Sequence, residues 1–214
     1  MKHVSAPVQP EKTKSLTRRA LAKQQTRAKV LAAARRLFSE SGYEGATIRD
    51  IAAAAGMSTG AVFANFADKS DLFREILLSD LDVLVEDMAE AARKGRTVED
   101  ALVRIFTAGY AFYKGQLPLA RAIFSVSWSP VEGKTMRSLA AVSRMVELIA
   151  RQLTLGIERG ELVQEADVKL RSQMLFDIYL SNYPQAIYGG WSLEALQASS
   201  KEQIRIILAG AKRG

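Results

Sequence analysis

The 214-residue chain contains no cysteine and only one histidine, His3. The lack of cysteine excludes disulfide bonds, thiolate zinc sites and cysteine nucleophiles. A lone histidine leaves metal binding and serine–histidine catalysis almost no side chains to use. We therefore expect neither a metal nor a cofactor. The absence of disulfides also agrees with a reducing compartment, so we expect a cytoplasmic location.

Long hydrophobic runs and strand patterns are also scarce. No apolar run approaches the roughly 18 residues of a membrane span, and the first residues lack the apolar core of a signal peptide. No sustained alternation of β-branched residues predicts a strand. With 48% hydrophobic residues, the chain nevertheless has enough apolar material to bury in a folded core.

Positive charge is concentrated at one end of the chain. The net charge is +7, and the first 29 residues carry all of it, with eight Lys or Arg and a single acid, Glu11. We interpret residues 1–25 as a flexible basic arm. Such an arm on a neutral body is typical of a protein with a polyanionic partner, nucleic acid or a membrane surface, although a solubilising tail has the same composition.

Helical periodicity fills the rest of the chain and predicts an all-α protein. Capping residues mark helix starts at Thr47, Ser58, Asp68, Thr97 and Ser192, and glycine or proline marks the ends. The predicted helices, about nine in all, cover roughly 26–39, 47–55, 58–66, 68–92, 97–113, a short stretch ending at Trp128, 132–159, 167–188 with a break at Pro184, and 192–208.

Residues 47–66, TIRDIAAAAGMSTGAVFANF, have the pattern of a helix-turn-helix. Gly56 can adopt positive φ in the turn, and the small side chain of Ala52 lets the two helices approach closely. The second helix carries small and polar residues where a buried helix would carry an apolar face. A helical hairpin that merely packs in the core is the alternative interpretation. The neighbouring basic residues favour DNA binding, with the second helix in the major groove.

Residues 26–77 resemble the DNA-binding domain of the TetR/AcrR family of bacterial transcriptional repressors. The matching pieces are AAxxLF before Gly42-Tyr43, Thr47, IAxxAGxS at 51–58, G-x-V-[aromatic]-x-x-F at 60–66, and Lys69 with Leu72. The resemblance implies an N-terminal helix-turn-helix domain over residues 26–70 and a larger helical ligand-sensing and dimerisation domain over 71–214. It also implies a homodimer that binds a palindromic operator in double-stranded DNA.

The resemblance further implies which residues contact DNA. Thr47 and Lys69 would meet phosphates, and Thr59, Gly60 and Asn65 would face bases or phosphates. Asn65 could pair with adenine or could contact phosphate alone. The full set comprises Arg27, Thr47, Arg49, Ser58, Thr59, Gly60, Phe63, Asn65 and Lys69.

One position in this set departs from the family pattern. The family usually has tyrosine where this chain has Phe63. We expect Phe63 to keep the packing of that ring and to lose one hydrogen bond, at a cost of about 1 kcal/mol per subunit.

Aromatic residues recur at helical spacing between residues 97 and 190. Such stripes are typical of a packed core, but a cluster rich in Tyr and Trp also favours a cavity for a small apolar or aromatic effector. The candidate effector-binding residues are Phe106, Tyr110, Tyr113, Phe124, Trp128, Phe176, Tyr179 and Tyr183. The resemblance implies a dimer contact from the last helices, through Leu175, Ile178, Leu193, Leu196, Ile204, Ile207 and Leu208.

Two other classes of function compete with DNA binding. An enzyme would have to use carboxylates or lysine, and the candidates Glu147, Glu158 and Asp177 show no paired spacing, so we expect no catalytic activity. A membrane-surface or scaffold protein with a basic arm, without sequence-specific DNA binding, is the remaining alternative.

Overall fold

The computed structural model describes residues 18–114, 117, 119–121 and 140–211. In that part of the chain the helices are α1 (Arg18–Gly45), α2 (Ile48–Ala54), α3 (Thr59–Phe63), α4 (Lys69–Arg93), α5 (Val98–Lys114), α7 (Ala140–Glu158), α8 (Val168–Ser181), α9 (Tyr183–Ile187) and α10 (Leu193–Ala209). The all-α prediction is confirmed. The predicted short helix ending at Trp128 and the start of the helix predicted over 132–159 lie outside the described residues.

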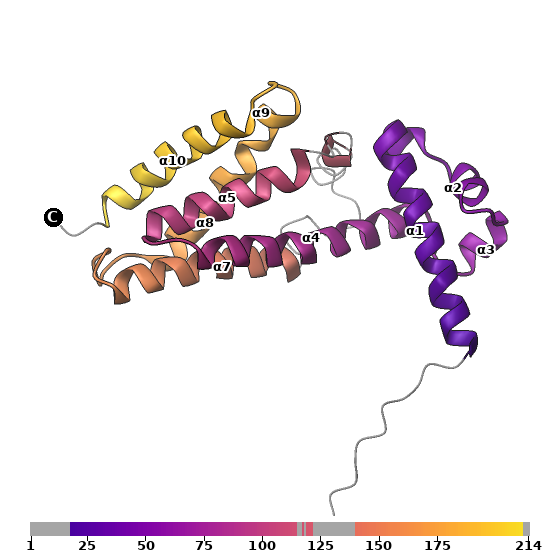
Figure 1. The fold of residues 1–214 in the computed structure, drawn as a ribbon, viewed down its shortest axis with the longest axis horizontal. Coiled ribbons are helices and arrows are strands. Elements are labelled where there is room, and N and C mark those ends of the chain that lie inside the picture. The colour runs from indigo at the N-terminus through magenta and orange to yellow at the C-terminus, as the bar shows by residue number, and fades with distance from the viewer. Residues whose placement is uncertain (1–17, 115–116, 118, 122–139, 212–214) are drawn as a thin grey trace, which may run out of the picture.

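The molecule is elongated, with α1, α2 and α3 grouped at one end (Figure 1). Helix α4 runs from this group along the length of the larger part, where it lies beside α5 and α7. Helices α8 and α10 complete that part and pack against each other. Since α4 is continuous from Lys69 to Arg93, it crosses the predicted domain boundary at residue 70 without a break.

Local capping produces these helix starts. The side chains of Thr47, Ser58, Asp68 and Ser192 each accept a hydrogen bond from the backbone N–H three residues later. This interaction satisfies one of the N–H groups that the first helical turn leaves free. The capping predictions at these four positions are therefore confirmed.

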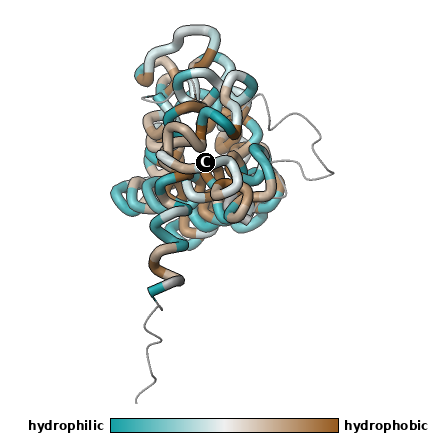
Figure 2. Tube along the Cα trace, turned by 90° about the vertical axis from the view of Figure 1, so that its right-hand side faces the viewer, coloured by the Kyte–Doolittle hydropathy of each residue, from teal (hydrophilic) through white to brown (hydrophobic). Residues whose placement is uncertain are grey.

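The beginning of α1 differs from the prediction. Residues 18–25 were expected to belong to a flexible arm, but they form the first two turns of α1. The sequence RRALAKQQ contains only strong helix formers and no Gly or Pro, so helix propensity prevails over charge repulsion. These turns project beyond the body of the protein (Figures 1 and 2). Gly42 ends the regular part of α1, as predicted, with a φ of 72°.

A continuous apolar core holds the two ends of the molecule together. Phe38 of α1 packs edge-on against Phe73 of α4, with ring centroids 5.4 Å apart. Farther along α4, Leu81, Leu84 and Met88 are buried against the helices of the larger part. None of the described helices is long and apolar enough to span a membrane.

Candidate DNA-binding surface and effector cavity

The helix-turn-helix is held by a small apolar core. Ile51 and Val62 are fully buried, Ala52 is 2% exposed, and Gly56 takes a φ of 67° in the turn between α2 and α3. The backbone N–H of Met57 donates to the carbonyl of Ala52 at 2.9 Å, which closes the turn. This packing fixes α3 relative to α2 and leaves the outer side of α3 free.

The start of α3 is small, polar and open to solvent. Ser58, Thr59 and Gly60 are all exposed. The nearest atom to a Cβ placed on Gly60 would be Ser58 Oγ at 3.9 Å, so nothing within the protein requires glycine there. Arg49 on α2 is also exposed. Thr47 is exposed as well, but its hydroxyl donates to Asp50 Oδ2 at 2.6 Å.

The charged groups of Arg27 and Lys69 form hydrogen bonds with backbone carbonyls around the helix-turn-helix. Arg27 bonds the carbonyl of Asn65 at 2.6 Å, pairs with Glu75 and lies over the ring of Phe66. Lys69 donates to the carbonyls of Tyr43 and Ala46 at 2.9 and 3.2 Å. Both side chains therefore brace the helices around the turn, a structural use that the sequence did not reveal.

Two further candidates are placed differently from the expectation. Phe63 is 55% exposed, so the prediction that its ring packs within the protein is wrong. The ring lies at the last position of the short α3, on its solvent side. Asn65 is half-buried: its Nδ2 donates to the carbonyl of Ala61 at 2.9 Å, and its Oδ1 is buried. Asn65 thus faces α3 itself, and an adenine contact would require it to leave this position.

The described aromatic candidates form one cluster between α5, α8 and α9. Tyr179 stacks on Tyr110 with ring centroids 5.2 Å apart and meets Tyr183 edge-on at the same distance. Phe106 is fully buried against Tyr110 and Tyr179 and lines neither of the two cavities that border the cluster. Phe124 and Trp128 lie outside the described residues. The cluster is therefore partly core, as the alternative interpretation held.

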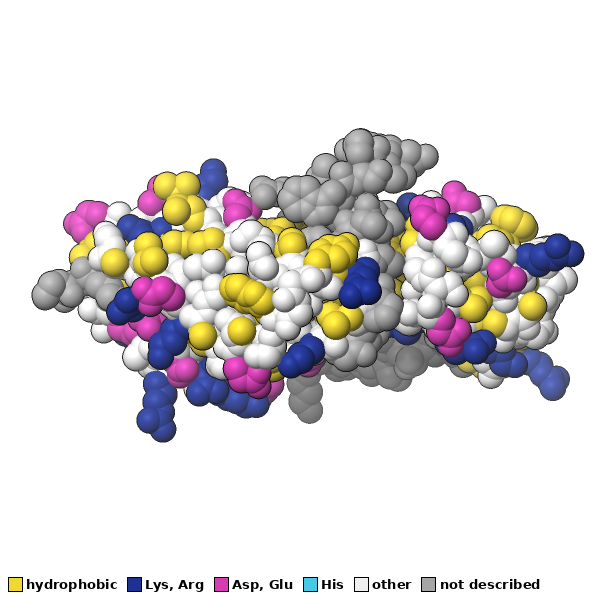
Figure 3. Space-filling model, turned by 90° about the horizontal axis from the view of Figure 1, so that it is seen from above, with side chains coloured by type: hydrophobic (Ala, Val, Ile, Leu, Met, Phe, Trp, Pro, Cys, Tyr) yellow, Lys and Arg dark blue, Asp and Glu magenta, His cyan; other side chains and the backbone are white. Residues whose placement is uncertain are grey.

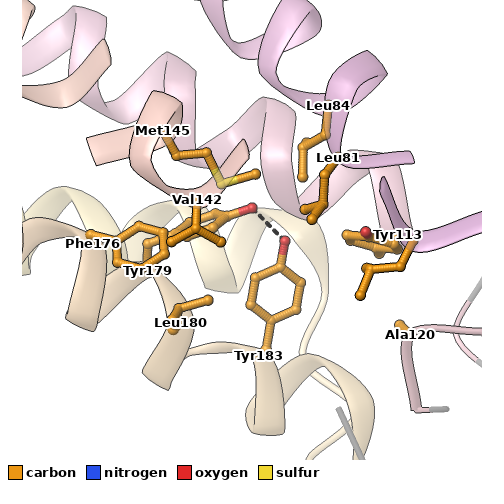
Figure 4. A pocket seen from close by; sticks show the side chains of 11 residues that line it. Leu81, Leu84, Tyr113, Ala120, Val142, Met145, Phe176, Tyr179, Leu180 and Tyr183 are labelled. Atoms are coloured by element: carbon orange, nitrogen blue, oxygen red, sulfur yellow. Dashed lines mark hydrogen bonds between the residues drawn. The ribbon is translucent and has the colours of Figure 1, made fainter. Parts of the chain in front are cut away.

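An apolar cavity borders this cluster (Figure 4), and about 30 Å³ of it is open to the centre of a water molecule. It is narrow, because an ordinary effector site is several hundred Å³ in size. The lining side chains come from α4, α5, α7, α8 and α9 and include Leu77, Leu81, Leu84, Tyr113, Val142, Met145, Phe176, Tyr179 and Tyr183.

The four tyrosines of the cluster differ in the hydrogen bonds that their hydroxyl groups form. Tyr183 donates to the carbonyl of Gly109 at 3.0 Å, and the Tyr179 hydroxyl bonds that of Tyr183 at 2.5 Å (Figure 4). Tyr110 donates to the carbonyl of Tyr179 at 3.2 Å. The hydroxyl of Tyr113 is buried without a hydrogen-bond partner in the described part of the chain. Only this hydroxyl on the cavity wall is available to a ligand.

Burial controls the acidity of these phenols. It raises the pKa of Tyr110 to about 12 against the opposing effect of hydrogen bonds from Ser200 and Asn182. Burial also raises the pKa of Tyr113, and the negative charge of Asp80 raises it further. The pKa values of Tyr179 and Tyr183 are raised by burial as well. All four hydroxyls are therefore neutral hydrogen-bonding groups at physiological pH.

Most of the predicted dimer residues are not at the surface. Five of them, Leu175, Leu196, Ile204, Ile207 and Leu208, are at most 7% exposed, and they fill the protomer's own core. Ile178 and Leu193 are half-buried. The exposed apolar residues on the same helices are Leu170 and Met174 of α8 and Ile206 of α10. Apolar side chains on an amphipathic helix first cover their own core, which is why the apolar pattern selected residues that are buried within the protomer.

One charged pair between α1 and α4 was not predicted from the sequence. Asp80 is 4% exposed and pairs through Oδ1 with Arg35. Its signal in the sequence is an acid within the apolar stripe of Ile76, Leu77, Leu81 and Leu84. An ionisable residue on a buried helix face is almost always paired.

The described residues include no cluster of three or more His, Asp or Glu that could hold a metal ion.

Comparisons with known proteins agree with this architecture. Residues 30–76 match the family of bacterial regulatory proteins named after TetR. The chain is 43% identical over 65 residues to the HTH-type transcriptional repressor AcnR of Corynebacterium efficiens, a match that covers 30% of this chain and 35% of that protein. The match thus spans only about a third of the length of that relative.

Longer similarities are weaker in sequence and extend over the larger part. The fatty acid metabolism regulator protein of Bacillus subtilis is 22% identical over 151 residues, which are 69% of this chain and 76% of that one. The crystal structure of the regulator FadR from Bacillus subtilis in complex with stearoyl-CoA has a TM-score of 0.69 at 21% identity and covers 83% of this chain and 96% of that chain. The segment 30–76 thus matches the TetR family of bacterial regulatory proteins, and the chain as a whole shares the fold of the solved FadR structure.

Proposed function

We propose that the protein is a ligand-responsive transcriptional regulator, a repressor, which binds operator DNA through α2 and α3. The observation that carries this proposal is the exposed start of α3. The exposed residues at the start of this helix, which α2 fixes in place, are Ser58, Thr59 and Gly60. Their small size allows a close approach to a major groove. The family match over residues 30–76 supports the same conclusion.

Positive charge on α1 suits this role. Arg18 and Lys23 are exposed on the helical turns that project from the body, and Arg49 is exposed beside α3. Each contact between such a side chain and a phosphate releases counterions, which strengthens binding to any DNA sequence. The alternative of a membrane-surface or scaffold protein would use the same charge, but it gives no role to the small polar start of α3.

The operator would be a palindrome bound by a homodimer. We place the dimer contact on the exposed face of α8 and α10 that carries Leu170, Met174 and Ile206. Helix α10 faces the viewer in Figure 3, where apolar side chains lie among polar ones over this part of the molecule. A stable dimer needs roughly 800 Å² from each partner, so two adjacent helices are a suitable size.

The dimer contact can be tested with two matched substitutions. Ile206→Glu should shift the dimer towards monomer in sedimentation or light scattering, because it places a charge in an apolar contact. Val83→Glu is the control, since Val83 is 50% exposed but lies on α4. Dissociation by the control alone, or by neither variant, would move the interface elsewhere.

The effector would enter the cavity lined by Tyr113, Phe176 and Tyr183. The lining is almost wholly apolar, so a small apolar or aromatic molecule fits its chemistry. Because the cavity is narrow, binding must move its walls, and the flexible side chain of Met145 is the easiest to displace. A neighbour of the same fold is described in complex with stearoyl-CoA, which supports the proposal that this protein also binds an effector.

Selection of bound duplexes from a random DNA pool tests the proposed function. We expect the recovered sequences to share a palindrome with two half-sites about one helical turn, or a multiple of it, apart. Recovery of no common sequence, together with salt-sensitive binding to anionic vesicles, would support the membrane-surface alternative instead.

A further inference from the structure

Two buried polar atoms beside the cavity have no hydrogen-bond partner in the described part of the chain. One is the hydroxyl oxygen of Tyr113, whose side chain is 7% exposed and lines the cavity. The other is Oδ2 of Asp80, which is 4% exposed. Buried polar atoms are nearly always hydrogen-bonded, because an unpaired one loses its interaction with water and gains nothing. Two such atoms on neighbouring helices therefore point to a ligand group that would satisfy both.

Asp80 is not part of the cavity lining but lies on α4 between residues that are. It is three residues after Leu77 and four before Leu84, which both line the cavity, so it shares a helix face with them. Its negative charge also raises the pKa of Tyr113. The unpaired donor is therefore on α5 and the unpaired acceptor on α4, two helices that pack against each other.

The same carboxylate reaches the DNA-binding end of the protein. Its other oxygen, Oδ1, accepts a hydrogen bond from Arg35 Nη2 on α1. Asp80 therefore has one oxygen towards α1 and one unpaired oxygen. A ligand group that hydrogen-bonds Oδ2 therefore interacts with the same negative charge that is paired with Arg35.

We propose that the effector carries a hydroxyl group on an apolar body, and that this hydroxyl bridges Tyr113 and Asp80. It accepts a hydrogen bond from Tyr113 and donates one to Asp80 Oδ2. Arg35, as a positioning residue, transmits occupancy of the cavity to α1. This inference rests on the proposed function and names both the ligand chemistry and the link to the DNA-binding surface. The change in the free energy of DNA binding equals the difference in effector-binding free energy between the protein with the Arg35–Asp80 pair formed and the protein with that pair broken.

A first test needs no ligand. Tyr113→Phe should leave the thermal unfolding midpoint unchanged or raise it, because the substitution removes an unpaired hydroxyl and keeps the ring. Tyr179→Phe is the matched control, since it removes a hydroxyl on the same cavity wall that is already bonded to Tyr183. The control should lower the midpoint. A lower midpoint in Tyr113→Phe would show that its hydroxyl is already satisfied and would overturn the proposal.

A second test compares benzyl alcohol with toluene, which differ by one hydroxyl. The wild-type protein should bind benzyl alcohol about fivefold or more tightly, as one additional hydrogen bond predicts. Tyr113→Phe and Asp80→Asn should each reduce this preference, whereas Tyr179→Phe should retain it. Equal binding of the two compounds by the wild-type protein, or no binding of either, would overturn the proposal.

A third test examines the link to DNA. Benzyl alcohol should change the affinity of the wild-type protein for a selected duplex, and Arg35→Gln should abolish this change while benzyl alcohol still binds. Arg36→Gln is the control on the same helix, because Arg36 forms only an exposed pair with Glu40 at 3.9 Å. An unchanged response in Arg35→Gln would overturn the link. If the wild-type protein binds no duplex, the proposed function fails, and the preference for benzyl alcohol still decides the part played by Tyr113 and Asp80.

Discussion

Gly109 lies on α5 directly against the side chain of Tyr179 on α8. A Cβ added there would overlap the hydroxyl oxygen of Tyr179 and would lie 2.6 Å from Cε of Met88. Met88 can move the end of its flexible side chain, but Tyr179 is held by its bond to Tyr183. Gly109→Ala should therefore force α5 and α8 apart or break that hydrogen bond.

The expected loss of stability follows from two opposing terms. Overpacking of this kind costs typically about 1–3 kcal/mol. Alanine in a helix interior recovers about 0.5–1 kcal/mol relative to glycine. The net destabilisation is thus about 1–2 kcal/mol, which in a domain of this size lowers the melting temperature by about 2–8 °C.

A double-mutant cycle with Tyr179→Phe identifies the cause of this loss. Tyr179→Phe alone should cost about 1 kcal/mol, because one hydrogen bond is lost. It also removes the oxygen nearest to the new methyl group and leaves the ring carbon Cε2, 2.7 Å from the added Cβ, so the double variant should lose less stability than the sum of the two single losses. Thermal melts followed by circular dichroism measure all four proteins. Additive losses, or a Gly109→Ala protein as stable as the wild type, would refute this description of the packing.

Three further predictions concern the rest of the molecule. Phe63→Ser should change stability by less than about 0.5 kcal/mol, since the ring is exposed. The same substitution should weaken binding to a selected duplex about tenfold, whereas Leu78→Ser on α4 should not weaken it. Replacing Arg18 and Lys23 with Gln should flatten the slope of log K against log salt by about 0.9 for each phosphate that the protein no longer neutralises, and should leave base preference unchanged. Unfolded tyrosine ionises at about pH 10, and the pKa of Tyr110 is raised to about 12. Between these two pH values folding stability should fall as the pH rises, because only the unfolded state loses the proton. Phenolate absorbance from the buried tyrosines should therefore appear only as helical signal is lost.

Features that depend on local contacts could be predicted from the sequence. The caps at Thr47, Ser58 and Asp68 involve a side chain and a backbone N–H only three residues apart, so the pattern of residue types is sufficient. The turn at Gly56 and the buried Ile51 follow from the same short-range pattern. The start of α1 differs from the expectation because helix propensity over residues 18–25 outweighs the repulsion between their charges.

Features that depend on distant contacts could not be predicted. The hydroxyl of Tyr183 is bonded by Gly109, 74 residues away, and that of Tyr113 is not bonded, although both rings have the same helical spacing. Periodicity likewise cannot tell which apolar side chains of α10 fill the protomer core. Ile207 is buried and its neighbour Ile206 is 66% exposed, a difference that only the packing of α10 against α5 and α8 determines.

The central claim is that the start of α3 enters a DNA groove, and Gly60→Leu tests it most directly. Apart from the adjacent residues and the backbone of α3, the nearest atom of the described residues to a Cβ at this position is Ser58 Oγ, 3.9 Å away, so the variant should keep the wild-type melting temperature. A leucine side chain would occupy the space that the DNA requires. We predict that the affinity for a selected duplex, measured by fluorescence anisotropy, falls by at least about a hundredfold and loses its preference over random DNA. Wild-type affinity and preference in a stably folded Gly60→Leu protein would contradict the account.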